Sequence, residues 1–213
     1  MAVNLTKCAG CQTCTMACKL DNKTPAGVMW RNVRDVEFGK YPNVKRFFLP
    51  VQCMQCLHPS CLEVCPTTAT KRRPDGIVFI DYEKCIGCGY CVLACPYEAR
   101  WLIREIESYY DKVDTDTSGT AASFRENHYK DLVGICTKCD FCMDRIDAGL
   151  KAGKIVGKDP EATPVCANSC LANAITFGDL EDPSSELSRV IKDRHAFRLH
   201  PELGNDPSVY YYW

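Results

Sequence analysis

Sixteen of the seventeen cysteines in this 213-residue chain fall into four groups of four, at spacings suited to binding metal. Two groups share the spacing C-x2-C-x2-C-x3-C, one widens the middle gap to four residues, and one widens it to twenty-three. Thiolates are soft, anionic ligands for iron–sulfur cores and for zinc, so the spacing has to distinguish these two chemistries. In chain order, the groups are I (Cys8, Cys11, Cys14, Cys18), II (Cys53, Cys56, Cys61, Cys65), III (Cys85, Cys88, Cys91, Cys95) and IV (Cys139, Cys142, Cys166, Cys170).

The repeated spacing favours iron–sulfur clusters. In bacterial two-cluster ferredoxins the run C-x2-C-x2-C-x3-C-P supplies three ligands to one cluster and its fourth to the neighbouring cluster. Pro66 and Pro96 follow the last cysteines of groups II and III. A structural protein with several four-cysteine zinc sites is the alternative, but zinc does not explain the x3-C-P endings. Four complete groups predict four [4Fe–4S] clusters.

The register of group IV decides which cysteine is left over. Cys136, Cys139 and Cys142 could form a ferredoxin triplet, but Ile146 stands where its closing ligand should be. A lysine precedes the first cysteine of groups I and III, and Lys138 precedes Cys139 in the same way. We therefore start the group at Cys139 and predict that Cys136 is a non-ligand that acts as a small apolar residue.

Lysines next to ligands have two interpretations. A cluster gains negative charge on reduction, so nearby lysines and backbone N–H groups shift its potential. Lys7, Lys84 and Lys138 are candidates for this tuning. The alternative is that they are solvated surface side chains.

The two inner groups, II and III, predict a complete ferredoxin module over about 51–105. A hairpin with a Pro74-Asp75-Gly76 turn separates them. The two outer groups, I and IV, lack the closing proline and each needs a partner, so we expect them to pair with each other. Their module would combine about 1–20 with 136–180. The fold class is then α+β: two nested bacterial two-cluster ferredoxin-like modules with short helices, hairpins and long loops.

The ferredoxin ligand rule gives four ligand sets, in which the first three cysteines of one group share a cluster with the fourth of its partner. Cluster 1 takes Cys8, Cys11, Cys14 and Cys170; cluster 2 takes Cys139, Cys142, Cys166 and Cys18; cluster 3 takes Cys53, Cys56, Cys61 and Cys95; cluster 4 takes Cys85, Cys88, Cys91 and Cys65.

The remaining segments are predicted to be supports and surfaces. Apolar residues on both sides of a glycine-containing turn indicate a second hairpin over 28–49, and helical spacing indicates a helix over 143–152. The polar stretch 107–131 predicts a long loop excursion. Asp182-Pro183 is typical of a helix start, here for a helix of about ten residues within a C-terminal segment, 181–213. We expect its aromatic tail to pack on its own module or on a partner.

Composition and missing motifs exclude other classes. A net charge of −1 gives no electrostatic reason to expect a nucleic-acid partner. The first ligand arrives at residue 8, so we expect no signal peptide, and no run of ~18 apolar residues indicates a membrane span. There is no glycine-rich nucleotide fingerprint, and the recognisable cofactor ligands all belong to clusters. We therefore expect no catalytic residues and no enzyme activity from this chain by itself.

Beyond the cysteines, three stretches resemble a known family. They are Lys138–Gly149, Pro164–Cys170 and Phe177–Pro183. With the cysteine groups, they make nearly the whole chain similar to the four-cluster, ferredoxin-type beta subunit of molybdenum or tungsten bis-pyranopterin oxidoreductases, the dimethyl sulfoxide reductase superfamily. Two departures stand out: a longer insertion between Cys142 and Cys166, and Leu171 where the family commonly has proline.

The resemblance implies an electron-transfer subunit. Its clusters would connect a catalytic molybdenum or tungsten pterin subunit to a soluble carrier or, often, to a membrane quinone-reactive subunit. It further implies that cluster 1 lies nearest the catalytic subunit and that the inner pair lies between the two outer clusters. Such complexes can be exported folded on the catalytic subunit's signal, so we expect a soluble subunit, attached to the membrane through partners, in the cytoplasm or the periplasm. A stand-alone polyferredoxin is the alternative function.

Overall fold

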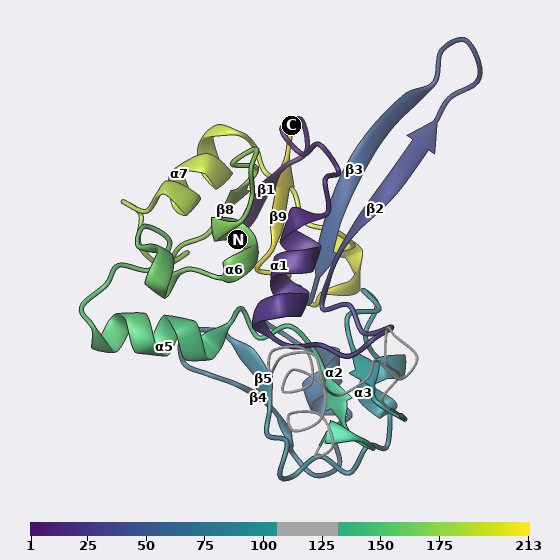
Figure 1. The fold of residues 1–213 in the computed structure, drawn as a ribbon, viewed down its shortest axis with the longest axis vertical. Helices are drawn as coiled ribbons and strands as arrows, with labels where there is room; N and C mark the ends of the chain where they lie inside the picture. Colours follow the sequence, from purple (N-terminus) through teal and green to yellow (C-terminus); the bar gives the residue numbers. More distant parts are fainter. Residues whose placement is uncertain (106–131) are drawn as a thin grey trace, which may run out of the picture.

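The computed structural model of the chain describes residues 1–105 and 132–213, and shows an α+β fold of short helices and small sheets (Figure 1). The predicted loop over 107–131 lies outside the described residues. The helices are α1 (Thr13–Asp21), α2 (Ser60–Glu63), α3 (Tyr90–Leu93), α5 (Met143–Lys151), α6 (Val165–Asn168) and α7 (Glu186–Asp193), with 3-10 turns η2 (Pro160–Ala162) and η3 (Pro201–Leu203). The strands are β1 (Ala2–Asn4), β2 (Arg31–Phe38), β3 (Lys45–Gln52), β4 (Thr70–Arg72), β5 (Val78–Ile80), β6 (Trp101–Leu102), β7 (Cys136–Thr137), β8 (Ile175–Thr176) and β9 (Tyr210–Tyr212).

A three-stranded sheet joins the two ends of the chain. Its order is β8-β1-β9, with β1 antiparallel to β8 and parallel to β9. Helix α7 covers it, because the fully buried Leu187 packs with Ala2 and Tyr212. The aromatic tail therefore packs on its own chain, as a strand that the sequence did not predict. Trp213 beyond it remains exposed and contacts Phe47 edge-to-face at 5.5 Å.

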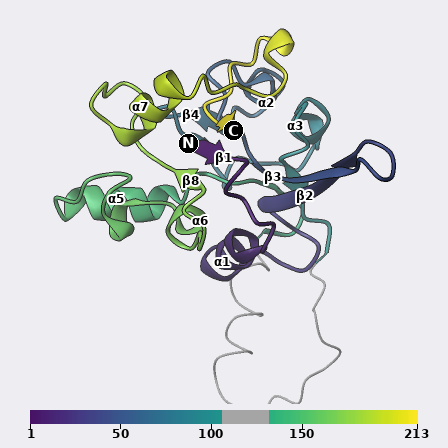
Figure 2. The same cartoon turned by 90° about the horizontal axis from the view of Figure 1, so that it is seen from above.

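Both predicted hairpins are present. Strands β2 and β3 pair without interruption from Arg31 opposite Gln52 to Phe38 opposite Lys45, and their tip projects away from the body (Figures 1 and 2). Strands β4 and β5 pair across the predicted turn, where Gly76 takes a left-handed φ of 85°. Glycine adopts this conformation without the steric penalty of a Cβ atom.

One predicted helix is confirmed and one begins later than expected. Helix α5 fills the segment predicted over 143–152. Helix α7 begins at Glu186, not directly after Asp182-Pro183, because Ser185 is its N-cap and accepts the backbone N–H of Ser188. Asp182 forms a local turn, accepting from the backbone and hydroxyl of Ser184. Asp182 and Ser185 could each cap the helix, and Ser185 is the residue that does so.

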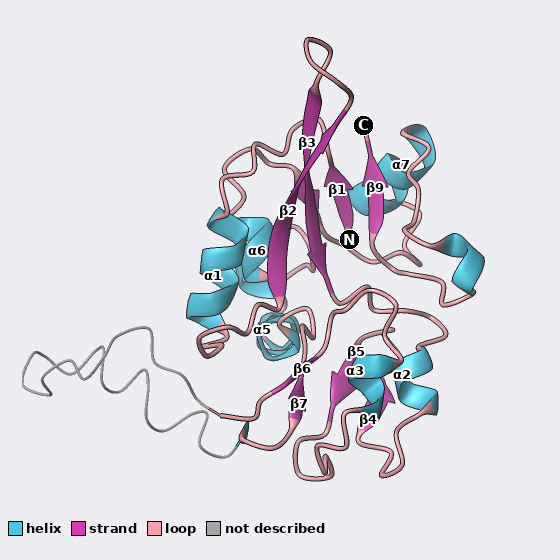
Figure 3. Ribbon diagram, turned by 90° about the vertical axis from the view of Figure 1, so that its right-hand side faces the viewer, coloured by secondary structure: helices cyan, strands magenta, loops and turns pink. Residues whose placement is uncertain are grey.

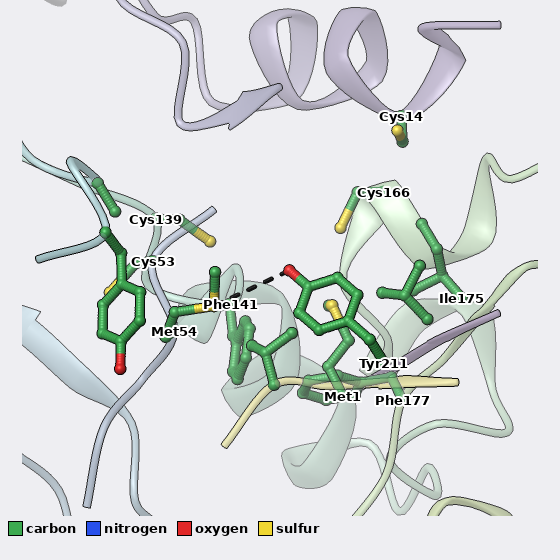
Figure 4. Packing of buried hydrophobic residues seen from close by; sticks show 14 of the residues in the cluster. Met1, Cys14, Cys53, Met54, Cys139, Phe141, Cys166, Ile175, Phe177 and Tyr211 are labelled. Atoms are coloured by element: carbon green, nitrogen blue, oxygen red, sulfur yellow. Dashed lines mark hydrogen bonds between the residues drawn. The ribbon is translucent and has the colours of Figure 1, made fainter. Parts of the chain in front are cut away.

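The apolar core contains cysteines among ordinary core residues. Figure 4 shows Met54, Phe141, Phe177 and Tyr211 packed between the cysteines of several groups. The fully buried Tyr211 hydroxyl donates to the Pro50 carbonyl oxygen at 2.8 Å. Figure 3 shows the helices and strands as separate elements, and the sheets have two or three strands each. The cysteine groups are therefore positioned by a shared core rather than by one large sheet.

Candidate iron–sulfur sites

The third and fourth cysteines of each group are positioned by a helix. The third lies on α1, α2, α3 or α6 (Cys14, Cys61, Cys91 and Cys166). The fourth follows four residues later, still on α1 in group I and just beyond the helix in the other groups. A separation of four residues places two side chains near each other along one helix face. Helices α1 and α6 pack together, and so do α2 and α3.

The first two cysteines of each group flank a left-handed turn. The residue before the second cysteine has a positive φ in all four groups: 68° at Gly10, 49° at Gln55, 67° at Gly87 and 59° at Phe141. Consecutive backbone N–H groups in such turns form concave anion sites. This repeat is hidden in the sequence, because only two of the four residues are glycine.

Three cavities are each lined by a quartet of cysteines from two groups, and the third also by Cys136. One is lined by Cys8, Cys11, Cys14 and Cys170; the second by Cys53, Cys56, Cys61 and Cys95; the third by Cys65, Cys85, Cys88 and Cys91, together with Cys136. The structure brings together the cysteines predicted for clusters 1, 3 and 4.

The fourth set meets around Cys139, which is buried. Burial, and then repulsion from the thiols of Cys18, Cys142 and Cys166, raises the pKa of Cys139 well above its ordinary value. Cys18 in turn interacts electrostatically with Cys166 and Cys142. The cysteines predicted for cluster 2 therefore also lie together, although Cys18 belongs to the other end of the chain.

Cys136 lies in the wall of the third cavity, which the apolar interpretation missed. It is almost fully buried, and its backbone N–H donates to Cys85 Sγ at 3.4 Å. Hydrogen bonding between the side chains of Cys91 and Cys136 lowers the pKa of Cys91 and raises that of Cys136. This direction suits Cys91 as the anionic ligand and Cys136 as a hydrogen-bond donor to it.

Backbone N–H groups point at ligand sulfurs. The N–H of Thr70 donates to Cys65 Sγ at 3.5 Å, and that of Ala174 donates to Cys170 Sγ at 3.2 Å. The second contact forms although Leu171, not proline, follows Cys170, and Leu171 is exposed. This departure from the family pattern thus leaves the sulfur environment intact.

The donor sets fit iron–sulfur clusters better than single ions. Within residues 1–105 and 132–213, no three Cys, His, Asp or Glu side chains converge closely enough to hold one metal ion. Four thiolates on zinc would all lie about 2.3 Å from the same point. The cysteines of three quartets surround cavities instead, and such cavities match a core of several atoms. A bound [4Fe–4S] core would supply one-electron redox chemistry there.

The four quartets follow one another in a row. Cys14 and Cys166 interact electrostatically and lie near each other in Figure 4, on helices α1 and α6 that pack together, so the quartets of clusters 1 and 2 are neighbours. Gln55, from the third quartet's first loop, donates to the carbonyl oxygen of Cys139 at 2.7 Å. Arg100 lines the cavities of both the third and the fourth quartet. The expectation that the inner pair separates the two outer sites is therefore wrong, because the outer groups share one helix packing.

Three buried cations lie among the quartets. Lys138 is 1% exposed and its ammonium group donates to the carbonyl oxygens of Val78 and Cys139, so it is not the surface lysine of the alternative interpretation. Lys7 and Lys84 are exposed. Arg31 and Arg100 are also buried, and sequence reasoning missed both, since nothing in their local pattern distinguishes them from surface arginines.

The fold and the cysteine cavities define a ferredoxin-like protein with paired [4Fe–4S] sites. Consistent with this class, a family model described as a 4Fe-4S dicluster domain matches residues 44–108, and another with the same description matches 77–145. Within the described ranges, no helix is long and apolar enough to cross a membrane.

Curated relatives identify the family. The chain is 38% identical to a selenate reductase subunit of Mesobacillus selenatarsenatis, over 99% of this chain and 70% of that one. It is 34% identical to a tetrathionate reductase subunit of Salmonella typhimurium, over 99% and 70%. It is 35% identical to the iron-sulfur cluster-binding subunit of menaquinone reductase from Nitratidesulfovibrio vulgaris, over 99% and 87%.

The chain belongs to the family of four-cluster iron–sulfur beta subunits of molybdenum and tungsten oxidoreductases. It is an electron-transfer subunit that carries four [4Fe–4S] clusters and is not catalytic by itself.

Proposed function

We propose that the chain conducts electrons along a row of four [4Fe–4S] clusters, in the order 1, 2, 3, 4, between a catalytic subunit and an electron carrier. Clusters 1 and 2 belong to an outer module built from both ends of the chain, and clusters 3 and 4 belong to an inner module nested within it. Each cluster takes three cysteines from one group and the fourth from its partner group.

The observation that carries this proposal is the exposure of the cysteines along the row. Of the seventeen cysteines, all of which are described, only Cys11 and Cys88 are exposed. Cys11 belongs to the first quartet and Cys88 to the last. An electron relay needs one accessible cluster at each end and protected clusters between them, which is the distribution seen here.

The crossed ligand sets are supported by the packing of helices. Group I meets group IV where α1 packs on α6, and group II meets group III where α2 packs on α3. Sheet β8-β1-β9 holds the start of the chain beside the strand that follows group IV. Cys18 and Cys170 therefore each lie against the group at the other end of the chain.

We further propose the partners from the family and from the relatives' names. A catalytic molybdenum or tungsten bis-pyranopterin subunit would face cluster 1 at Cys11. A membrane quinone-reactive subunit or a soluble carrier would face cluster 4 at Cys88. The relatives act in selenate, tetrathionate and menaquinone reductases, so the same relay serves different chemistry, and the substrate is decided in the partner chain.

The test is anaerobic purification of the chain with its native partners, followed by metal and sulfide analysis. We expect about sixteen irons and sixteen labile sulfides per chain, and one molybdenum or tungsten in a co-purifying large subunit. Four zincs and no visible absorbance would replace the cluster assignment with the zinc alternative. Full cluster content without any co-purifying metal-pterin subunit would instead support a stand-alone polyferredoxin.

A further inference from the structure

Arg100 lies between the two inner cysteine cavities and lines both of them. Its Nη2 donates to Cys61 Sγ of the third quartet at 2.9 Å, and its Nη1 donates to the Thr70 hydroxyl at 3.0 Å. Its charge also acts on Cys91 of the fourth quartet. Only 4% of the residue is exposed, and no carboxylate within the described residues forms an ion pair with it.

Arg31 is the corresponding buried cation beside the outer quartets, at the start of strand β2, which packs on α1. It is 1% exposed and interacts electrostatically with Cys166 of the second quartet and Cys14 of the first. Its Nη1 contacts the side chains of Gln52 and Met1, while its Nε and Nη2 have no hydrogen-bond partner among the described residues. Burying an arginine with unpaired N–H groups destabilises the folded protein, unless a neighbouring anion compensates the charge.

A reduced [4Fe–4S] cluster is such an anion. Each electron that a thiolate-bound cluster accepts adds negative charge, and net charge and hydrogen bonds to sulfur set its potential. Arginine stays protonated in proteins, so the compensating charge is constant. Because both guanidinium groups are buried, solvent and salt screen their effect less than they would at the surface.

We propose that Arg100 and Arg31 set the reduction potentials of the inner and the outer cluster pair, respectively, each by placing one buried positive charge beside the clusters of its pair. The inference rests on the proposed ligand sets. Each arginine favours the reduced state of both clusters in its own pair and acts little on the other pair. An electron moving within a pair therefore stays beside the same positive charge.

The experiment is a potentiometric titration of the anaerobically purified holoprotein, monitored by electron paramagnetic resonance. Signals are assigned to the four clusters by their separate loss in Cys170→Ser, Cys18→Ser, Cys95→Ser and Cys65→Ser. We expect Arg100→Gln to shift the midpoint potentials of both inner clusters downward and to leave the outer pair in place. Arg31→Gln should shift the midpoint potentials of both outer clusters downward and leave the inner pair in place. Arg100→Lys and Arg31→Lys, which keep the charge, should retain most of the wild-type potential.

Arg73→Gln is the matched control. Arg73 is partly buried and pairs with Asp147 and Asp75 rather than with a cysteine, so its loss should move no potential. Unchanged inner potentials in a fully loaded Arg100→Gln protein would overturn the proposal, as would equal shifts in the Lys and Gln variants. If Arg100→Gln fails to load iron, Arg31→Gln and the two Lys variants decide the question. A wild-type protein with fewer than four clusters would instead overturn the proposed function.

Discussion

The inner and outer cysteine groups form the same kind of ligand set, but different structural elements bring their cysteines together. The inner groups lie within residues 53–95 and are joined by the short hairpin β4–β5. The outer groups lie near residues 8–18 and 139–170 and meet only because sheet β8-β1-β9 and the contact between α1 and α6 close the chain on itself. Local contacts form at lower entropic cost than distant ones. The ferredoxin spacing therefore works in both settings, but the outer sites depend on complete tertiary closure.

The strongest test of this comparison replaces one cysteine ligand of each cluster pair by serine. We expect Cys18→Ser to lose the cluster bound by Cys139, Cys142 and Cys166, and with it about four irons. Cys65→Ser should remove one cluster of the inner pair and leave both clusters of the outer pair intact. Iron analysis and electron paramagnetic resonance of the reduced proteins measure both effects. If Cys18→Ser instead removes the cluster held by Cys8, the crossed ligand sets are wrong.

Shortening one core side chain beside each cluster pair should make that pair the first to be released on unfolding. Leu187 is fully buried against the sheet that closes the outer sites, and Ile80 is buried beside Cys61 and Cys91 of the inner ones. Leucine- or isoleucine-to-alanine changes in cores destabilise proteins by about 2–5 kcal/mol. We expect Leu187→Ala to release the outer clusters first as denaturant is added, and Ile80→Ala to release the inner ones first. The same order of release in both variants would argue against two separable modules.

Equivalent glycines in the two C-x2-C loops offer a smaller and more local contrast. Gly10 and Gly87 have nearly the same φ, 68° and 67°, so alanine adds about 1–2 kcal/mol of left-handed strain at either position. A Cβ at Gly87 would lie 1.7 Å from the carbonyl oxygen of Gly134, whereas one at Gly10 would meet the ring of Phe48 at 2.4 Å. A side-chain ring moves aside more readily than backbone. Thermal unfolding should therefore show Gly87→Ala to be the more damaging change.

The smallest expected effect concerns Cys136. We expect Cys136→Ser and Cys136→Ala to retain all four clusters and the wild-type iron content. Alanine removes the donor to Cys91, so the potential of that one cluster should fall, while serine keeps a hydroxyl donor and should preserve it more closely. The other three potentials are the internal control in the same titration. A lost cluster in either variant would place Cys136 among the ligands and shift the register of group IV.

The cysteine spacing marked the four groups because a ligand group is encoded locally, mostly three or four residues at a time, and the structure brings the predicted partners together. The hairpins and α5 were predictable for the same reason. The left-handed turns at Gln55 and Phe141 were not, since neither residue type favours that conformation. The row of quartets and the burial of Arg31 depend on how distant segments pack, which no local pattern records.

The two buried arginines also bear on how the protein is assembled. Without clusters, Arg100 would donate to a protonated thiol at Cys61, because burial raises the pKa of that thiol to about 11. Burial likewise raises the pKa of Cys166, the thiol that interacts with Arg31. An uncompensated buried charge costs several kcal/mol, whereas cluster anions remove that penalty. Maturation and folding are then linked, as in other proteins whose metal sites do not exist in the unfolded chain. Chains with incomplete cluster content would remain unstable and open to proteolysis. The compact form that can join a complex is therefore the form that already contains its clusters.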